Sequence, residues 1–338
     1  PWNEWPQDIK NRENAAMEHY KNELADDIEY HNFIQFLFFK QWGDVKRYAN
    51  ENGIKIIGDI PIFVAADSSD AWANPEIFLF DKERKPVKVA GVPPDYFSAT
   101  GQLWGNPLYN WEKLRDTNYN WWVERVRSNL STCDIIRIDH FRGFEAYWAV
   151  PYGDDTAING QWEPGPGIDL FNAIKSQLGE LPIIAEDLGL MTQGVIDLRE
   201  ATGFPGMKIL GFAFDSGEEN DYLPHTYTRN CVVYTGTHDN DTLVGWFQKA
   251  KEEDREFARN YLNSRADEEI HWDAIRGAWS SVACMAISPV QDFLGLGSEA
   301  RINTPGVASG NWQWRLKQGV LTNELAERIA KLTKIYSR

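Results

Sequence analysis

Cysteine is scarce in this chain, and its three copies lie far apart. Among 338 residues there are only Cys133, Cys231 and Cys284, with no CxxC pair and no even-numbered framework. This spacing argues against a disulfide scaffold and against a zinc site, because both need several closely spaced cysteines. Cys133 and Cys231 each open a predicted strand, so we expect both to be buried free thiols.

Positive charge is also in short supply. The chain has 34 Lys and Arg against 50 Asp and Glu, a formal net charge of −16. This balance argues against binding to nucleic acid or to anionic membranes, since both attract basic surfaces. No apolar run reaches transmembrane length and no signal peptide is evident. We therefore expect a cytoplasmic protein, or a plastid protein if the source is a plant.

Aromatic residues, in contrast, are abundant. The chain contains 15 Trp, 13 Tyr and 17 Phe. A hydrophobic core is the default interpretation for most of them. Many nevertheless lie beside Gly, Asn, Pro and Asp in stretches typical of loops. Flat apolar rings next to polar groups suit the faces of a sugar, so the composition also favours carbohydrate binding.

Short apolar runs typical of buried strands recur along the chain. The predicted strands lie within residues 54–64, 133–143, 181–189, 207–214, 231–241 and 284–290. They alternate with helical patterns or longer insertions, which predicts an α/β fold with a parallel sheet covered on both faces. We favour a (β/α)8 TIM barrel over an open doubly wound sheet, because no GxGxxG follows the first strand. The six strands are two short of the eight that a barrel needs.

The remaining segments divide into helices and one long insertion. We expect residues 1–52 to be mostly helical, with the aromatic cluster at 33–39 on a buried helix face and Gly53 ending the helix. Later helices are predicted at 119–131, 169–177, 192–203, 252–283 and from 321 onward. Residues 65–131 are predicted to form an inserted subdomain in the catalytic barrel that spans 1–338. A loop at 91–109, rich in Pro, Gly and aromatics, is its candidate binding segment. The alternative is a side subdomain that packs its own core.

Three predicted strands end in carboxylates, namely Asp139, Glu186 and Asp239. Because active sites of α/β barrels gather at the carboxyl ends of the strands, we expect these groups to share a site. Two carboxyl groups flanking a glycosidic bond are the minimal machinery for glycosyl transfer, one as nucleophile and one as acid and then base. Arg137 lies on the same strand face as Asp139 and would hold it ionised.

Other side chains in these stretches fit the same chemistry. Glu186 would have to begin protonated, which apolar or anionic surroundings such as Asp187 would favour. His238 offers a neutral donor to a sugar hydroxyl. Each residue alone is weak evidence, since an isolated strand-end Asp is more often a helix cap or an ion-pair partner. The Asp239-Asn240-Asp241 cluster could equally be a metal site, because hard cations prefer oxygen ligands.

Several motifs together identify a resemblance to a known family. They are RIDHFRG at 137–143, IAEDLG at 184–189, GTHDNDT at 236–242 and the loop from Pro93 to Tyr109. They resemble the amylomaltases, or 4-alpha-glucanotransferases, of glycoside hydrolase family 77 in the α-amylase superfamily. The similarity extends from Trp2 to the C-terminal helix.

The resemblance implies specific roles. Asp139 would be the nucleophile, Glu186 the general acid/base and Asp239 a stabiliser of the transition state. The implied substrate-binding residues are Asp59, Arg137 and His238 at the cleavage point, Tyr96, Phe97 and Trp104 along the groove, and Gln102 and Asn240 nearby. The implied reaction transfers a segment of a 1,4-alpha-glucan to the 4-hydroxyl of glucose or another glucan. Maltooligosaccharides and 1,4-alpha-glucans would be the partners, and no metal or organic cofactor is expected.

One departure from the family pattern bears on the fold. Family members carry further upstream sequence that includes the first two barrel strands, whereas this chain begins at Pro1. The resemblance therefore implies a barrel without its first two strands, with a subdomain inserted after the strand ending near Val64. The absent N-terminal segment is then an expected partner of the chain. Three other functions stay open: an alpha-glucan hydrolase on the same carboxylates, a non-catalytic glucan-binding fragment and a metal-dependent hydrolase.

Overall fold

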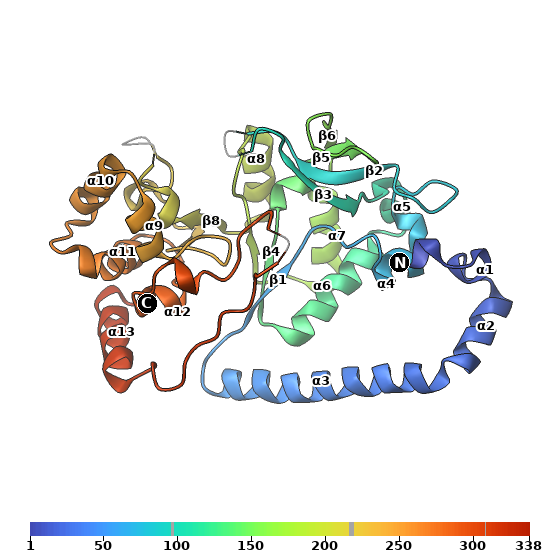
Figure 1. Ribbon diagram of the computed structural model, residues 1–338, viewed down its shortest axis with the longest axis horizontal. Coiled ribbons are helices and arrows are strands. Elements are labelled where there is room, and N and C mark those ends of the chain that lie inside the picture. Colours follow the sequence, from blue (N-terminus) through green and yellow to red (C-terminus); the bar gives the residue numbers. More distant parts are fainter. Residues whose placement is uncertain (96–97, 216–219, 308) are drawn as a thin grey trace. The chain divides into compact units, whose positions relative to one another are not determined.

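The computed structural model describes residues 1–95, 98–215, 220–307 and 309–338 (Figure 1). The chain divides into two compact units, Pro1–Phe204 and Pro205–Arg338, and each is described by itself. All six predicted strands are present, three in each unit. Both units combine parallel strands with helices, so the predicted α/β class is confirmed.

The parallel sheet of unit 1 contains β1 (Ile57–Ile60), β4 (Ile135–Ile138) and β7 (Ile183–Ala185), in the order β1-β4-β7. Every residue of β4 and β7 is buried, which explains their unbroken apolar sequence. The helix α6 (Asn120–Thr132) packs on β1 and β4, and α7 (Ile168–Leu178) packs beside α6.

An antiparallel sheet forms the second layer of unit 1. Its order is β3-β2-β5-β6, with β2 (Lys88–Val92), β3 (Gln102–Pro107), β5 (Ala146–Pro151) and β6 (Gln161–Pro164). β2 and β3 are the two arms of the predicted loop at 91–109, and β5 and β6 come from beyond residue 131. The insertion boundaries of 65–131 stay a prediction, although the sheet that contains this loop extends past them.

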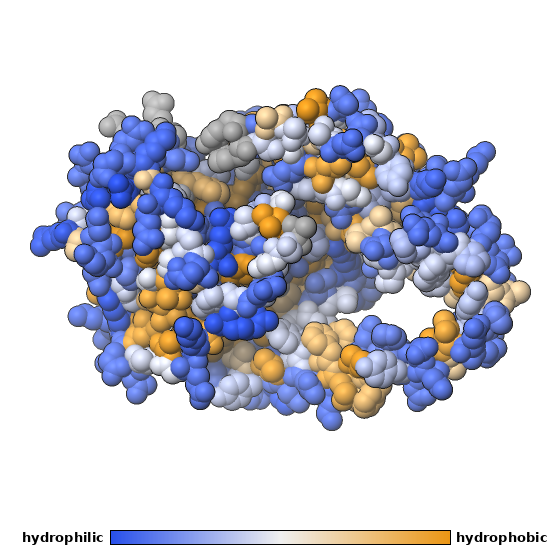
Figure 2. Space-filling model, in the orientation of Figure 1, coloured by the Kyte–Doolittle hydropathy of each residue, from blue (hydrophilic) through white to orange (hydrophobic). Residues whose placement is uncertain are grey.

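The first 52 residues are mostly helical, as predicted. They form α1 (Gln7–Lys10), α2 (Asn14–Glu23) and α3 (Ala25–Glu51), and Gly53 follows α3 with a φ of +75°. The prediction of a buried aromatic face was wrong. Phe33, Phe36 and Phe39 are each at least half exposed, and apolar side chains lie at the surface over α3 (Figure 2). Periodicity shows which side chains share a helix face, but it does not show what covers that face.

Aromatic residues elsewhere in unit 1 follow the default interpretation. Tyr109, Trp122, Phe141 and Phe144 are fully buried in one core cluster between the sheets and helices. The thiols of Cys133 and Cys231 are buried, as predicted. In the described part of the chain, no helix is long and apolar enough to cross a membrane.

Unit 2 is built on a second parallel sheet. It contains β8 (Gly206–Ile209), β9 (Cys231–Tyr234) and β10 (Met285–Ile287), in the order β10-β9-β8. Its helices are α9 (Leu243–Lys249), α10 (Glu252–Leu262), α11 (Ile270–Trp279), α12 (Val290–Phe293) and α13 (Asn323–Tyr336). The helical region predicted for 252–283 is confirmed, and it is divided because Asn263 takes a left-handed conformation that ends α10 before α11 begins.

Short helices complete both units. The α-helices are α4 (Ser69–Ala73), α5 (Trp111–Asp116) and α8 (Gln193–Thr202). The 3-10 helices are η1 (Trp2–Glu4), η2 (Pro75–Ile77), η3 (Phe141–Phe144), η4 (Leu210–Phe212), η5 (Pro224–Thr226), η6 (Asp267–Glu269) and η7 (Ser298–Ala300). The predicted cap of α8 is confirmed, since Thr192 Oγ1 accepts a hydrogen bond from the Val195 amide.

Candidate active site

Two carboxylates follow directly on neighbouring parallel strands of unit 1. Asp139 comes one residue after β4, and its amide donates to the Ile60 carbonyl at 2.9 Å. Glu186 comes one residue after β7, and its amide donates to the Ile138 carbonyl at 2.9 Å. The backbone hydrogen bonds of the parallel sheet thus continue through both residues and place them at the same edge of the sheet.

A buried arginine holds two acidic side chains at this edge. Arg137 Nη1 lies 3.0 Å from Asp139 Oδ1 and 2.6 Å from Asp59 Oδ2. Asp59 and Arg137 are direct neighbours in the β1–β4 register, and Arg137 and Asp139 share a strand face. A cation this close favours the ionised form of a carboxyl group, which is the form a nucleophile needs.

Glu186 lies in a different environment. Burial and the neighbouring charge of Asp139 raise its pKa to about 7, against the opposing effects of Arg137 and a backbone hydrogen bond. That bond comes from the His140 amide, which donates to Glu186 Oε2 at 2.7 Å. The Leu188 amide donates to Oε1 at 3.3 Å. Apolar and anionic surroundings of this kind were expected from the sequence for a carboxyl group that begins protonated.

His140 connects the carboxylates to the antiparallel sheet. Its φ of +52° places it in the left-handed region, and its amide reaches Glu186. Burial, with a smaller effect of Arg142, lowers the pKa of His140 to about 3, so the ring is neutral. The rings of His140 and Trp104 pack in a T-shaped arrangement, with 4.7 Å between their centroids. His140 was not among the predicted site residues, although it lies within the RIDHFRG motif.

The structure therefore brings part of the predicted groove to the carboxylates. Trp104 Nε1 donates to Gln102 Oε1 at 3.1 Å, and the Trp104 side chain keeps 37% of its surface exposed. An indole ring with one side on His140 and another open to solvent could contact a sugar. Tyr96 and Phe97, the other two aromatics predicted for this groove, lie outside the described residues.

The segment that follows Glu186 is anchored by a second buried arginine. Arg142 Nη1 donates to the Leu190 carbonyl at 2.5 Å, and its guanidinium carbon lies 3.9 Å from the Trp162 ring centroid. Asp187, directly after Glu186, pairs with Arg199 at 2.9 Å. These contacts orient the backbone beyond Glu186, and nothing in the sequence pattern alone indicated the pair of Arg142 and Trp162.

In unit 2 the predicted site residues follow β9. Asp239 Oδ1 accepts from Asn303 Nδ2 at 2.5 Å, and its Oδ2 lies 3.3 Å from His238 Nε2. Arg301 Nη2 donates to the Asp239 carbonyl at 2.6 Å. Hydrogen bonds thus hold both the side chain and the backbone of Asp239. Asn303 and Arg301 were not identified from the sequence, because they lie more than 60 residues downstream.

The two residues after Asp239 have local partners. Asn240 Oδ1 accepts from the amide and the hydroxyl of Thr237, at 2.8 and 2.9 Å, which closes a turn. Asp241 pairs with Lys249 and accepts from Ser298 Oγ, both at 2.7 Å. In the part of the chain that the structure describes, no group of three His, Cys, Asp or Glu side chains is arranged to hold a metal ion.

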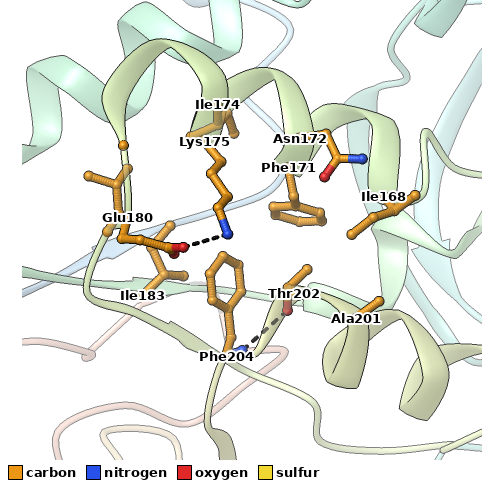
Figure 3. Close-up of a pocket in the computed structure, with 12 residues that line it drawn as sticks. Ile168, Phe171, Asn172, Ile174, Lys175, Glu180, Ile183, Ala201, Thr202 and Phe204 are labelled. Atoms are coloured by element: carbon orange, nitrogen blue, oxygen red, sulfur yellow. Dashed lines mark hydrogen bonds and ion pairs between the residues drawn. The ribbon is translucent and has the colours of Figure 1, made fainter.

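A small pocket at the opposite end of β7 is separate from these carboxylates. It is lined by α7, the start of β7 and the end of α8 (Figure 3). The rings of Phe171 and Phe204 in its wall meet edge to face, with 5.5 Å between their centroids. The Lys175–Glu180 ion pair borders it. Glu186 follows the other end of β7, so this pocket belongs to the packing between helices rather than to the site.

Comparison with known proteins decides the family. The family profile described as 4-alpha-glucanotransferase matches residues 1–322. A 4-alpha-glucanotransferase of Clostridium butyricum is 56% identical over all of this chain and 70% of its own length. One of Synechocystis is 54% identical over all of this chain and 67% of its own length. The chain belongs to the 4-alpha-glucanotransferase family.

A solved structure supports the same assignment. The amylomaltase of Streptococcus agalactiae in complex with acarbose is 42% identical, with a TM-score of 0.97 over all of this chain and 68% of that one. The predictions of the family, of an enzyme and of 4-alpha-glucanotransferase activity are therefore confirmed. The chain spans about two thirds of the length of these members of the 4-alpha-glucanotransferase family.

Proposed function

We propose that this chain transfers 1,4-alpha-glucan segments by double displacement, with Asp139 as nucleophile and Glu186 as acid and base. The observation that carries the proposal is the contrast between two carboxyl groups at adjacent strand ends. Asp139 lies 3.0 Å from the Arg137 guanidinium, whereas burial and the charge of Asp139 raise the pKa of Glu186 to about 7. A carboxylate paired with a cation, next to a second carboxyl group with a raised pKa, is an arrangement typical of glycosidases.

The first displacement consumes the donor glucan. Asp139 attacks the anomeric carbon, the glycosidic C–O bond breaks, and Glu186 gives its proton to the departing 4-oxygen. In the second displacement Glu186 takes the proton from the 4-hydroxyl of the acceptor. That oxygen then attacks the same carbon and releases Asp139. The two inversions retain the alpha configuration.

The other predicted site residues are proposed in supporting roles. Asp239 stabilises the positive charge that develops on the sugar, and its fixed carboxylate between Asn303 and His238 suits that task. Asp59, Arg137, His238 and Asn240 are proposed to bind sugar hydroxyls. Tyr96, Phe97, Gln102 and Trp104 are proposed to line the groove for donor and acceptor. These assignments rest on the family resemblance of the motifs.

Trp104 is proposed to favour transfer over hydrolysis. A transferase must admit a sugar hydroxyl while excluding water from the glycosyl intermediate. A hydrolase would use the same carboxylates, so only the acceptor side separates the two activities. Trp104 lies on His140, whose amide donates to Glu186, and it is part of the loop at 91–109.

Replacing Trp104 tests this role. We expect Trp104→Ala to lower transfer about tenfold or more while hydrolysis falls less, because an acceptor sugar loses its apolar contact and water does not. The measurement is the ratio of new oligosaccharides to reducing ends released from maltotriose. The matched control is Trp5→Ala, which removes an exposed tryptophan between η1 and α1. An unchanged ratio in Trp104→Ala would remove the loop from the mechanism.

The pKa of Glu186 predicts the pH dependence. Glu186 has to carry a proton for the first displacement, and its pKa is raised to about 7, so activity should be lost as pH rises through about 7. Burial is the largest cause of this increase, and the charge of Asp139 adds to it. The measurement is kcat/KM for maltotriose between pH 4.5 and 9. A profile that stays flat up to pH 9 would contradict the assignment of Glu186 as the acid.

We propose the finer fold as well, a (β/α)8 barrel without its first two strands and with an inserted subdomain. Among the described strands of unit 1, β1 pairs with β4 alone, which leaves its other edge for a further strand. The exposed aromatic face of α3 gives an upstream segment an apolar surface to cover. That segment is the proposed polypeptide partner, and a cytoplasmic or plastid location stays a prediction.

Incubation with maltotriose tests the function. Glucose together with a ladder of longer oligosaccharides is the expected result, since each transfer shortens one molecule and lengthens another. Shorter products alone would establish an alpha-glucan hydrolase. Binding of maltotriose without turnover, both by this chain and after addition of the proposed upstream segment, would indicate a glucan-binding protein. Loss of turnover in a chelator would support a metal-dependent hydrolase.

A further inference from the structure

Trp312 is a large aromatic side chain that stands open to solvent beside His238. The centroid of its ring lies 5.1 Å from that of the imidazole, at an interplanar angle of 39°. The residue keeps 57% of its surface exposed. Tryptophan is usually largely buried, so burial in the core does not explain this ring.

The backbone at Trp312 is held in an unfavourable conformation. Its φ of +61° lies in the left-handed region, which bulky residues avoid. The Trp312 amide donates to the Ile302 carbonyl at 2.8 Å, and its carbonyl accepts from Arg315 Nη1 at 3.2 Å. The preceding Asn311 accepts from the Thr304 amide at 3.0 Å through its side chain. Hydrogen bonds, rather than packing of the ring, therefore fix the place of Trp312.

Residues 302–303, which include the hydrogen-bond partner of Trp312, also orient the carboxylate of Asp239. Asn303 donates to Asp239 Oδ1, and its amide donates to the His238 carbonyl at 3.1 Å. Ile302, directly before Asn303, accepts the Trp312 amide. Hydrogen bonds to Ile302 and Asn303 thus place Trp312 in one constellation with His238 and Asp239. Strained residues in such constellations are often retained for a function that the strained geometry serves.

We propose that Trp312 is a stacking platform for a glucose unit of the bound glucan. A pyranose presents an apolar C–H face and a polar rim of hydroxyls. The exposed indole provides an apolar surface for the face, while His238 and Asp239 beside it provide polar partners for the rim. The proposal rests on the glucan transfer proposed above and names a further substrate-positioning residue for it.

Calorimetric titration with maltoheptaose tests the platform. Trp312→Ala should weaken binding about fivefold or more and raise KM more than it lowers kcat, because a bound sugar loses apolar contact area. Trp312→Phe, which keeps a flat ring, should recover most of the affinity. Trp5→Ala, at another exposed tryptophan, should bind as the parent does.

A glycine variant covers the case in which Trp312→Ala does not fold. Glycine takes a φ of +61° without strain, so Trp312→Gly should fold at least as well as the alanine variant and show the same loss of binding. Parent-like affinity and KM in either truncated variant, while the parent binds maltoheptaose and disproportionates maltotriose, would overturn the platform alone. A parent chain that neither binds nor turns over glucan would overturn the proposed function together with it.

Discussion

Asp139→Asn should reduce glucan transfer by about 10⁴-fold or more, a loss typical of removing a covalent nucleophile. An amide at this position cannot form the glycosyl ester on which both displacements depend. Glucan binding should remain close to that of the parent, because Arg137 keeps its contact with Asp59 at 2.6 Å. The measurements are initial rates of maltotriose disproportionation and calorimetric binding of maltoheptaose.

A matched carboxylate away from the site controls for the substitution itself. Asp116 ends α5 and forms an exposed ion pair with Lys113 at 3.4 Å. Exposed pairs of this kind contribute little to stability, so Asp116→Asn should keep full activity. Turnover above about one hundredth of the parent rate in Asp139→Asn, with the control intact, would remove Asp139 from the role of nucleophile.

Glu186→Gln should have the second largest effect. Without a proton donor the first displacement of a natural glucan should slow by about 10²–10⁴-fold, the usual contribution of general acid catalysis. A donor whose leaving group needs no proton, such as alpha-maltosyl fluoride, should recover the first displacement but not the second. Equal losses with maltotriose and with the fluoride in formation of the intermediate would contradict the assignment of Glu186 as the acid.

The same variant should change the pH dependence of stability. The pKa of Glu186 in the folded state is raised from its ordinary value of 4.5 to about 7, so the folded state binds an extra proton between these values. By linkage, the parent should therefore lose stability as pH rises from about 4.5 to 7, by up to about 3 kcal/mol. Glu186→Gln removes the titrating group and should flatten this slope, as chemical denaturation at pH 5 and pH 8 would show.

The strands and their terminal carboxylates could be predicted from the sequence because both depend on local features. Apolar β-branched runs such as 135–138 become buried parallel strands, and the residue after each strand reaches the carboxyl edge of the sheet. The face of α3 could not be predicted in the same way. The pattern at 33–39 indicates an apolar surface, but its burial depends on elements that the pattern does not contain.

The same distinction between local and long-range features applies to the residues of the site. Arg137 and Asp139 could be paired from strand alternation, which the structure shows as a 3.0 Å contact. The hydrogen bond from the His140 amide to Glu186 depends on a left-handed residue, and the contact of Asn303 with Asp239 joins positions 64 residues apart. Neither follows from spacing, since the path of a loop is set by the tertiary contacts along it.

Trapping the glycosyl intermediate tests the central claim most directly. Glu186→Gln would be incubated with alpha-maltosyl fluoride, because fluoride departs without acid catalysis while the weakened second displacement lets the intermediate accumulate. We predict that the protein gains one maltosyl group, and that peptide mapping places it on Asp139. A maltosyl group on another carboxylate, or rapid turnover of the fluoride with no adduct formed, would contradict a covalent mechanism through Asp139.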